Sequence, residues 1–263
     1  MIRFRRTTES DIPAGLGLCR AAGWNQTEAD WRIFLKLAPR TTSVATIDEA
    51  VVGTVSILDY GSGFAWLSML LVDPIARGRG VGTALFEHAL ELGSHIPCIR
   101  LDATPEGRRI YVRYGFTDDF ELTRWEGTPS APPLSLNAEM DRSRMAQMDR
   151  QVFGADRSAV LFSDPTAPHT LGESGFALAR RGFFADHIGP VVAGDAHLAA
   201  ALLQQVVLQL GGRPVILDVP DSAAAIVPPE FAGRRKLLRM SKGVNPSPGQ
   251  PEKEFAIRGP EFG

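Results

Sequence analysis

Cysteine, surplus charge and long apolar runs are all scarce in this sequence of 263 residues. Cys19 and Cys98 are too few for a disulfide framework, and no His/Cys cluster has zinc spacing, so we expect no metal. The 28 Lys and Arg against 30 Asp and Glu give a formal charge of -2, which disfavours nucleic acid and anionic membranes as partners. No run reaches the ~18 apolar residues of a membrane span, and the N-terminus lacks an apolar signal region. We therefore expect a cytoplasmic protein.

The composition is that of a globular protein, and its length favours two domains. Hydrophobic residues make up 44% of the chain and charged residues 22%, enough apolar surface for a buried core. Proline and small polar residues replace patterned sequence at 127–133 and again at 243–251, as in solvated connectors. We therefore predict a first domain over 1–127, a linker over 128–137, a second domain over 138–243 and a disordered tail over 244–263.

The second domain repeats landmarks of the first at a fixed distance. Pro74 precedes Asp102 by 28 residues, and Pro190 precedes Asp218 by the same number, so the offset is 116 in both cases. Each interval holds a strand end, a loop, one amphipathic helix and a short strand that ends in Leu-Asp. This repetition predicts that the second domain copies part of the first.

A loop rich in glycine and arginine, between a predicted strand and a predicted helix, is the most informative segment. Gly78, Gly80 and Gly82 let the backbone turn sharply and bring its N–H groups close to a bound group. Arg77 and Arg79 add positive charge beside the helix N-terminus, which favours a phosphate or pyrophosphate. The spacing fits neither a P-loop nor the GxGxxG fingerprint. The alternative is a flexible turn with solvated arginines.

The spacing Arg77-x-x-Gly80-x-Gly82 resembles the pyrophosphate-binding motif of the GNAT superfamily, the acyl-CoA-dependent N-acyltransferases. Residues 110–116 resemble the tyrosine-bearing helix of that family, and the resemblance covers 1–127. It implies an α/β (α+β) GNAT fold, whose mixed, mostly antiparallel central sheet is flanked by helices. The second part resembles the smaller, degenerate GNAT-like α/β domain that one subgroup carries.

The resemblance also implies a site for acetyl-CoA as co-substrate. A strand end would pair with the pantetheine arm, the loop would hold the pyrophosphate, and a backbone N–H near Leu71 would polarise the thioester carbonyl. The implied binding residues are Leu70, Leu71, Val72, Arg77, Gly78, Arg79, Gly80, Val81, Gly82 and Thr83. Tyr111 matches the position that protonates the departing thiolate, since a phenol with a pKa of ~10 is protonated at neutral pH. Packing against the sheet is the alternative role for Tyr111.

The acceptor amine must lose a proton, and Asp102 is our candidate base or amine anchor. The alternative is that Asp102 caps the helix that follows it. Glu121 and Asp59 are weaker candidates for the base.

Trp24 and His187 are our candidates for contacts with the acceptor. Trp24 falls in the helical region that shapes the acceptor pocket in the GNAT family, and core packing is its alternative role. In the second domain, Asp156, Arg157 and Arg180 could contact a polar or anionic acceptor, or else form structural ion pairs.

The second domain has lost the features of the anion-binding loop. At the 116-residue offset, Arg79 becomes Asp195 and Gly82 becomes Leu198. An aspartate therefore replaces an arginine, and a bulky leucine replaces a glycine. We predict that this domain does not bind CoA.

Together these features predict an N-acetyltransferase that acts on the amine of a small molecule by direct attack in a ternary complex. A protein or peptide N-terminal acetyltransferase and a non-catalytic acyl-CoA-binding regulatory module are the alternatives. The sequence leaves open whether the chain is a monomer or a homodimer.

Overall fold

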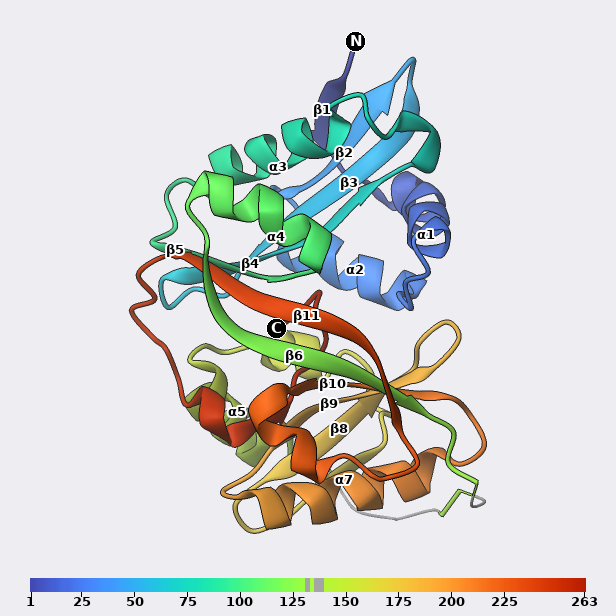
Figure 1. The fold of residues 1–263 in the computed structure, drawn as a ribbon, viewed down its shortest axis with the longest axis vertical. Helices are drawn as coiled ribbons and strands as arrows, with labels where there is room; N and C mark the ends of the chain where they lie inside the picture. Colours follow the sequence, from blue (N-terminus) through green and yellow to red (C-terminus); the bar gives the residue numbers. More distant parts are fainter. Residues whose placement is uncertain (131–132, 135–139) are drawn as a thin grey trace.

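The computed structural model describes residues 1–130, 133–134 and 140–263, so half of the predicted linker over 128–137 lies outside the described residues (Figure 1). Helices flank a central, mostly antiparallel sheet, which agrees with the predicted fold class. Among the described residues this sheet has twelve strands, in the order β1-β2-β3-β4-β5-β11-β6-β10-β9-β8-β7, with β12 paired to β9.

Apart from its last strand, the first half of the chain forms the upper part of Figure 1. Its elements are β1 (Arg3–Arg6), α1 (Ile12–Ala21), α2 (Glu28–Leu37), β2 (Thr42–Ile47), β3 (Ala50–Asp59), β4 (Phe64–Val72), α3 (Val81–Leu92), β5 (Cys98–Ala103), α4 (Pro105–Tyr111) and β6 (Thr117–Gly127). Local signals fix several of these boundaries. For example, α2 begins after Thr27 because Thr27 and Asp30 form a capping box.

The second half forms the lower part of the molecule. Its elements are α5 (Arg142–Phe153), α6 (Ser158–Leu161), β7 (His169–Leu171), β8 (Phe176–Arg180), β9 (Asp186–Val192), α7 (Ala196–Leu210), β10 (Val215–Pro220), β11 (Ala232–Gly243) and β12 (Glu254–Ala256). Helix α7 covers β8 and β9 as α3 covers β3 and β4. Among the described residues, no helix has the length and apolar character that crossing a membrane requires.

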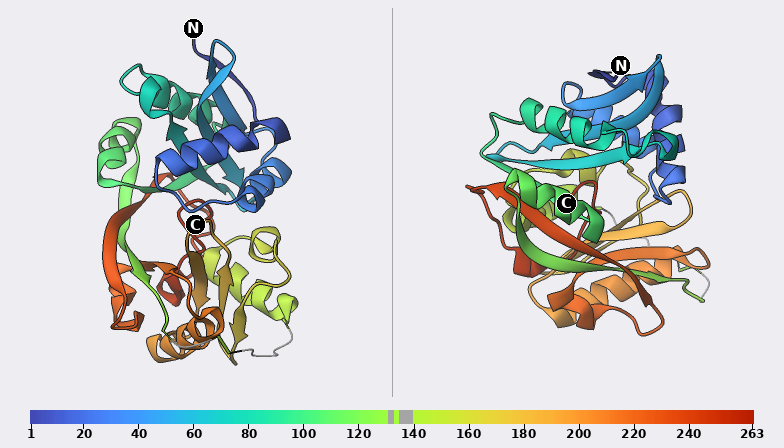
Figure 2. Two further views of the ribbon diagram at one scale, coloured as in Figure 1. Left: turned by 90° about the vertical axis from the view of Figure 1, so that its right-hand side faces the viewer. Right: turned by 45° about the horizontal axis from the view of Figure 1, so that its top comes forward.

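The two halves exchange their last strands. Strand β11 pairs with β5 over Leu238↔Ala103 to Gly243↔Cys98, and β6 pairs with β10 over Val215↔Gly127 to Pro220↔Leu122. Strands β6 and β11 also pair with each other, so both run across the middle of the molecule (Figures 1 and 2). Each half therefore completes its sheet with a strand from the other half. The 116-residue offset extends to these strands, since Gly127 and Gly243 end them.

The segment after residue 243 is folded, so our prediction of a disordered tail over 244–263 is wrong. Strand β12 pairs with β9, the side chains of Glu261 and Phe262 are buried, and the indole Nε1 of Trp66 donates to the carbonyl of Pro260 at 2.8 Å. The proline-rich stretch is a connector between two folded parts. The apolar residues beyond it find their partners only in the tertiary structure, which composition does not reveal.

Candidate active site

The glycine-rich loop leaves the N-terminus of α3 open. Gly80 is the N-cap residue with φ +78°, a left-handed conformation that favours glycine, and no side chain of the described residues caps the helix. Gly78 is also left-handed, with φ +73°. Arg77 and Arg79 are exposed beside these N–H groups, and Arg77 Nε donates to the carbonyl of Val72 at 3.4 Å. The loop therefore offers free backbone donors and two cations to a phosphate group.

Strands β4 and β5 lie side by side for only three residues and then diverge. Their pairing runs from Phe64↔Cys98 to Trp66↔Arg100. Beyond it, β4 pairs on its other edge with β3, while β5 pairs with β11. Between Leu67 and Val72, the edge of β4 that faces β5 has no strand partner among the described residues. An extended ligand arm can occupy such a gap by pairing with the free strand edge.

A β-bulge in β4 shapes the wall of this gap. Met69 and Leu70 together face the single residue Val55, and Met69 has φ +54°. The hydroxyl of Thr54 holds the bulge by donating to the Met69 carbonyl at 2.7 Å. The bulge changes the direction of the backbone where β4 borders the pocket, as bulges beside functional sites do. Leu70 lines the pocket, whereas Leu71 packs in the core against α1 and α2.

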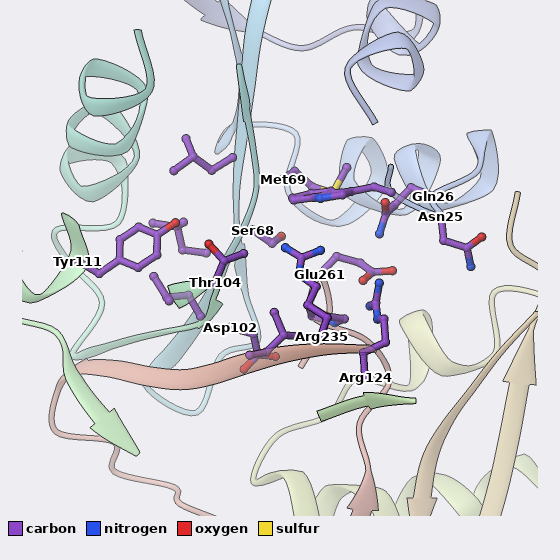
Figure 3. A pocket seen from close by; sticks show the side chains of 16 residues that line it. Asn25, Gln26, Ser68, Met69, Asp102, Thr104, Tyr111, Arg124, Arg235 and Glu261 are labelled. Carbon is purple, nitrogen blue, oxygen red and sulfur yellow. The ribbon is translucent and has the colours of Figure 1, made fainter. Parts of the chain in front are cut away.

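A cavity of about 160 Å³ lies in this gap (Figure 3). Strands of both halves and the C-terminal segment line it. The lining residues are Trp24, Asn25, Gln26, Leu67, Ser68, Met69, Leu70, Leu101, Asp102, Thr104, Tyr111, Arg124, Arg235, Leu237, Pro260 and Glu261. Of our predicted site residues, the structure thus brings Trp24, Leu70, Asp102 and Tyr111 together.

Tyr111 lies on one side of this cavity, at the C-terminal end of α4. Its ring packs on Phe86 and Phe116, with ring centroids 4.9 and 6.0 Å away. Burial raises the pKa of Tyr111 to about 12, because the phenolate would lose its solvation. The phenol is therefore protonated at neutral pH and carries a proton that it can donate.

Asp102 lies in the pocket wall, but Arg239 holds its carboxylate. Arg239 Nε and Nη2 each donate to one Asp102 oxygen at 2.9 Å. Burial raises the pKa of Asp102, and the guanidinium opposes that effect. The capping alternative is wrong, since Thr104 caps α4 by accepting from the Gly107 N–H at 3.1 Å. The catalytic role of Asp102 stays a prediction. In the structure, its ion pair with Arg239 links β5 to β11.

The tail that we expected to be disordered supplies a second carboxylate to the pocket. Glu261 is buried and accepts from Arg180, which also donates to Asp30 at 2.9 Å. Arg124 likewise binds Asp218 through two hydrogen bonds of 2.8 and 2.7 Å. Sequence reasoning missed Glu261 because no local signal places the chain terminus beside α2 and β4.

Other predicted acceptor contacts lie outside the pocket. His187 is buried in β9, and burial together with nearby arginines lowers its pKa, so it is neutral. It does not line the cavity, which makes its assignment to the acceptor site wrong. Arg157 and Arg180 are buried in ion pairs, and Asp156 accepts from the Ser158 N–H. These three residues therefore make structural contacts, which was our alternative to contact with the acceptor.

The weaker base candidates are also remote from the cavity. Asp59 accepts from the Gly61 N–H in an exposed turn, and exposed Glu121 lies 3.9 Å from Lys236. Neither side chain lines the pocket. In the described part of the chain, no group of three or more His, Cys, Asp or Glu side chains is placed to hold a metal ion.

Comparison with known proteins identifies the family. Sequence models of the acetyltransferase (GNAT) domain match residues 38–118 and 145–256, which together make up more than half of the chain. The chain therefore belongs to the GNAT acetyltransferase family and has a GNAT-type domain in each half. Members of this family transfer acyl groups from acyl-CoA, so the reaction class is acyl transfer with acyl-CoA as co-substrate.

Individual relatives are similar to this protein over nearly the whole chain. The holothin acyltransferase of Pseudoalteromonas sp. (strain SANK 73390) is 23% identical over 272 residues, which cover 92% of this chain and 88% of that protein. A crystal structure from Pyrococcus horikoshii, assigned as an acetyltransferase, has a TM-score of 0.84 and 24% identity, and covers 100% of this chain and 96% of the other. A GCN5-related N-acetyltransferase from Sphaerobacter thermophilus has a TM-score of 0.64 and 17% identity, covering 94% and 96% of the two chains.

Proposed function

We propose that this protein transfers an acetyl group from acetyl-CoA to the amine of a small molecule within a ternary complex. The observation that carries the proposal is a continuous path in the first half. The open N-terminus of α3 follows directly from β4, and the free edge of β4 leads to the pocket that contains Tyr111. The phosphates, the pantetheine arm and the thioester of acetyl-CoA each find suitable groups along this path.

The residues divide the chemical work as follows. The α3 N-terminus with Arg77 and Arg79 would bind the pyrophosphate, and the bulge at Met69 and Leu70 borders the thioester carbonyl. As the amine nitrogen forms its bond to the carbonyl carbon and the carbon–sulfur bond breaks, Tyr111 would donate its proton to the sulfur. The amine proton would leave to solvent or to a pocket carboxylate.

The size of the pocket supports a small acceptor. At about 160 Å³ it is smaller than the roughly 300–1,000 Å³ typical of sites for drug-sized ligands. The similarity to a protein named for acylating holothin points in the same direction. A compact amine therefore suits the pocket better than a segment of a folded protein.

Tyr111→Phe tests the proposal. We expect kcat to fall about a hundredfold, in line with the loss of a general acid, while calorimetry gives an unchanged Kd for acetyl-CoA. Because the Tyr111 pKa is raised to about 12, the wild type should keep its kcat up to about pH 10.

Tyr114→Phe is the matched control, since the Tyr114 hydroxyl binds exposed Glu87 at 2.7 Å outside the pocket. Equal turnover in Tyr111→Phe and the wild type would refute the general-acid role. Acetyl-CoA binding without thiol release for any amine would instead establish the non-catalytic regulatory module.

A further inference from the structure

Arg235 differs from the other charged side chains of the pocket because it has no acidic partner among the described residues. Asp102 pairs with Arg239, Glu261 with Arg180, and Arg124 with Asp218, all at hydrogen-bond distance. The guanidinium of Arg235, on β11, makes no hydrogen bond to any described residue and lies within 4 Å of no described carboxylate. It is thus the pocket's one uncompensated charge in the described part of the chain.

The surroundings of Arg235 destabilise the charged form of its guanidinium. The side chain is partly buried, and burial and the nearby Arg124 guanidinium both lower the pKa of Arg235. Asp218 and Glu106 act in the opposite direction from a distance, but Asp218 is already bound to Arg124. A partly desolvated cation without a partner favours binding of an anion.

The position of Arg235 indicates which ligand would supply the anion. Figure 3 shows Tyr111 on one side of the pocket and Arg235, Arg124 and Glu261 on the other. The pyrophosphate of acetyl-CoA has its own cations at the α3 N-terminus, beyond the end of β4. An anion beside Arg235 therefore belongs to the acceptor.

Two unsatisfied polar atoms also lie in the pocket wall. The hydroxyl of Ser68 and the Oε1 atom of Gln26 are buried and have no hydrogen-bond partner among the residues that the structure describes. Both residues line the cavity. Buried polar atoms without partners are rare in folded proteins, so these two atoms are available to further polar groups of a ligand.

We propose that the acceptor is an amine that carries a carboxylate, and that Arg235 binds this carboxylate while the amine faces Tyr111. The proposal rests on the proposed function and narrows it to amino acids and similar amino carboxylates. Arginine suits this task because its planar guanidinium can donate two parallel hydrogen bonds to a carboxylate. Polyamines are disfavoured, because they would bring a second cation to Arg235.

Pairs of amines that differ only in carboxylate against carboxamide provide the test. We would measure thiol release from acetyl-CoA with glycine, β-alanine, γ-aminobutyrate and phenylalanine, and with the four corresponding amides. In the wild type we expect kcat/KM to favour the carboxylate. In Arg235→Gln the ratio of carboxylate to carboxamide should fall about tenfold or more, and in Arg235→Lys it should fall less, because the charge remains.

Arg234→Gln is the matched control, since neighbouring Arg234 is exposed and does not line the cavity. It should keep the wild-type ratio, and thermal melts should show all three variants folded. A wild type that prefers the carboxamides, or an Arg235→Gln variant with an unchanged ratio, would overturn the carboxylate assignment while leaving acyl transfer intact. No thiol release with any amine, although acetyl-CoA binds, would overturn the proposed function itself and this inference with it.

Discussion

The two halves of this protein share one scaffold but differ at the place where acyl-CoA would bind. In the first half, α3 follows a left-handed glycine, Gly80, and its N-terminus is not capped by any side chain in the described part of the chain. In the second half, the side chain of Asp195 caps α7 by accepting from the Leu198 N–H at 2.9 Å. A carboxylate of the chain therefore occupies the position that a phosphate would need, and it repels a second anion.

The gap between the two diverging strands is also filled in the second half, unlike in the first. Strands β9 and β10 pair over only three residues, as β4 and β5 do. In the second half, however, β12 pairs with β9, and the Ile257 N–H donates to the Asp218 carbonyl at 3.0 Å. The chain's own residues 254–257 thus fill the gap. This difference supports our prediction that only the first half binds CoA.

The ion pairs that join the halves preserve the symmetry that the ligand sites have lost. Asp102 on β5 binds Arg239 on β11, and Asp218 on β10 binds Arg124 on β6. Each aspartate binds an arginine on the strand supplied by the other half. The duplicated architecture is therefore retained where it supports the sheet, and it has diverged where a ligand would bind.

The largest expected effect comes from separating the halves. A fragment of residues 1–127 should not fold alone, because β5 would lose its neighbour β11 and β6 would lose both β11 and β10. Circular dichroism and gel filtration would check this. Mixing the 1–127 and 128–263 fragments should restore a folded complex. A cooperative thermal melt of the 1–127 fragment alone would show that it folds without the strands of the second half.

Breaking one of the crossing ion pairs should have the next largest effect. Arg239→Met would leave the buried carboxylate of Asp102 unpaired and should lower the free energy of unfolding by about 3–5 kcal/mol. Urea denaturation provides the measurement, and Arg124→Met should show a similar loss. Replacing both partners with Asp102→Leu/Arg239→Met should recover most of the stability. A loss below ~1 kcal/mol in Arg239→Met would contradict a stabilising role for this ion pair.

A substitution in the glycine-rich loop before α3 should weaken the CoA binding that we expect to distinguish the first half from the second. Gly80→Asp imposes a side chain at φ +78° and places a carboxylate at the α3 N-terminus. We expect acetyl-CoA to bind about a hundredfold more weakly by calorimetry. Gly61→Asp, at φ +68° in the turn between β3 and β4, controls for backbone strain alone. Equal affinity in Gly80→Asp and Gly61→Asp would contradict the assignment of this loop.

The smallest expected effect lies at the matching helix of the second half. Asp195→Ala removes the cap of α7 and should cost about 1 kcal/mol of stability. Asp141→Ala, which removes the cap of α5, is the control. The variant should still bind one acetyl-CoA per chain, because residues 254–257 continue to fill the gap. A second equivalent in calorimetry would show that the cap alone excludes the ligand.

Much of the first half follows from local sequence signals. The alternating glycines and the two arginines identify the loop at the α3 N-terminus, and the segments that contain Tyr111 and Trp24 predict that both residues lie at the pocket. The family assignment, the fold class and the repetition of the fold in the second half are likewise apparent from motifs and their spacing. These features depend on residues close together in the chain or on a fixed offset.

Only the tertiary structure shows the exchange of β6 and β11, the burial of residues 254–263 and the composition of the far side of the pocket. Glu261, Arg235 and Arg239 reach the site from the end of the chain, across more than a hundred residues of sequence. His187 failed as an acceptor contact for the converse reason, since its surroundings are set by β8, β10 and Arg180 rather than by its neighbours in sequence. Backbone conformation and helix ends are decided by local interactions, which the sequence displays directly. Which distant strand completes a sheet, and which charge is left without a partner, depends on how the whole chain packs.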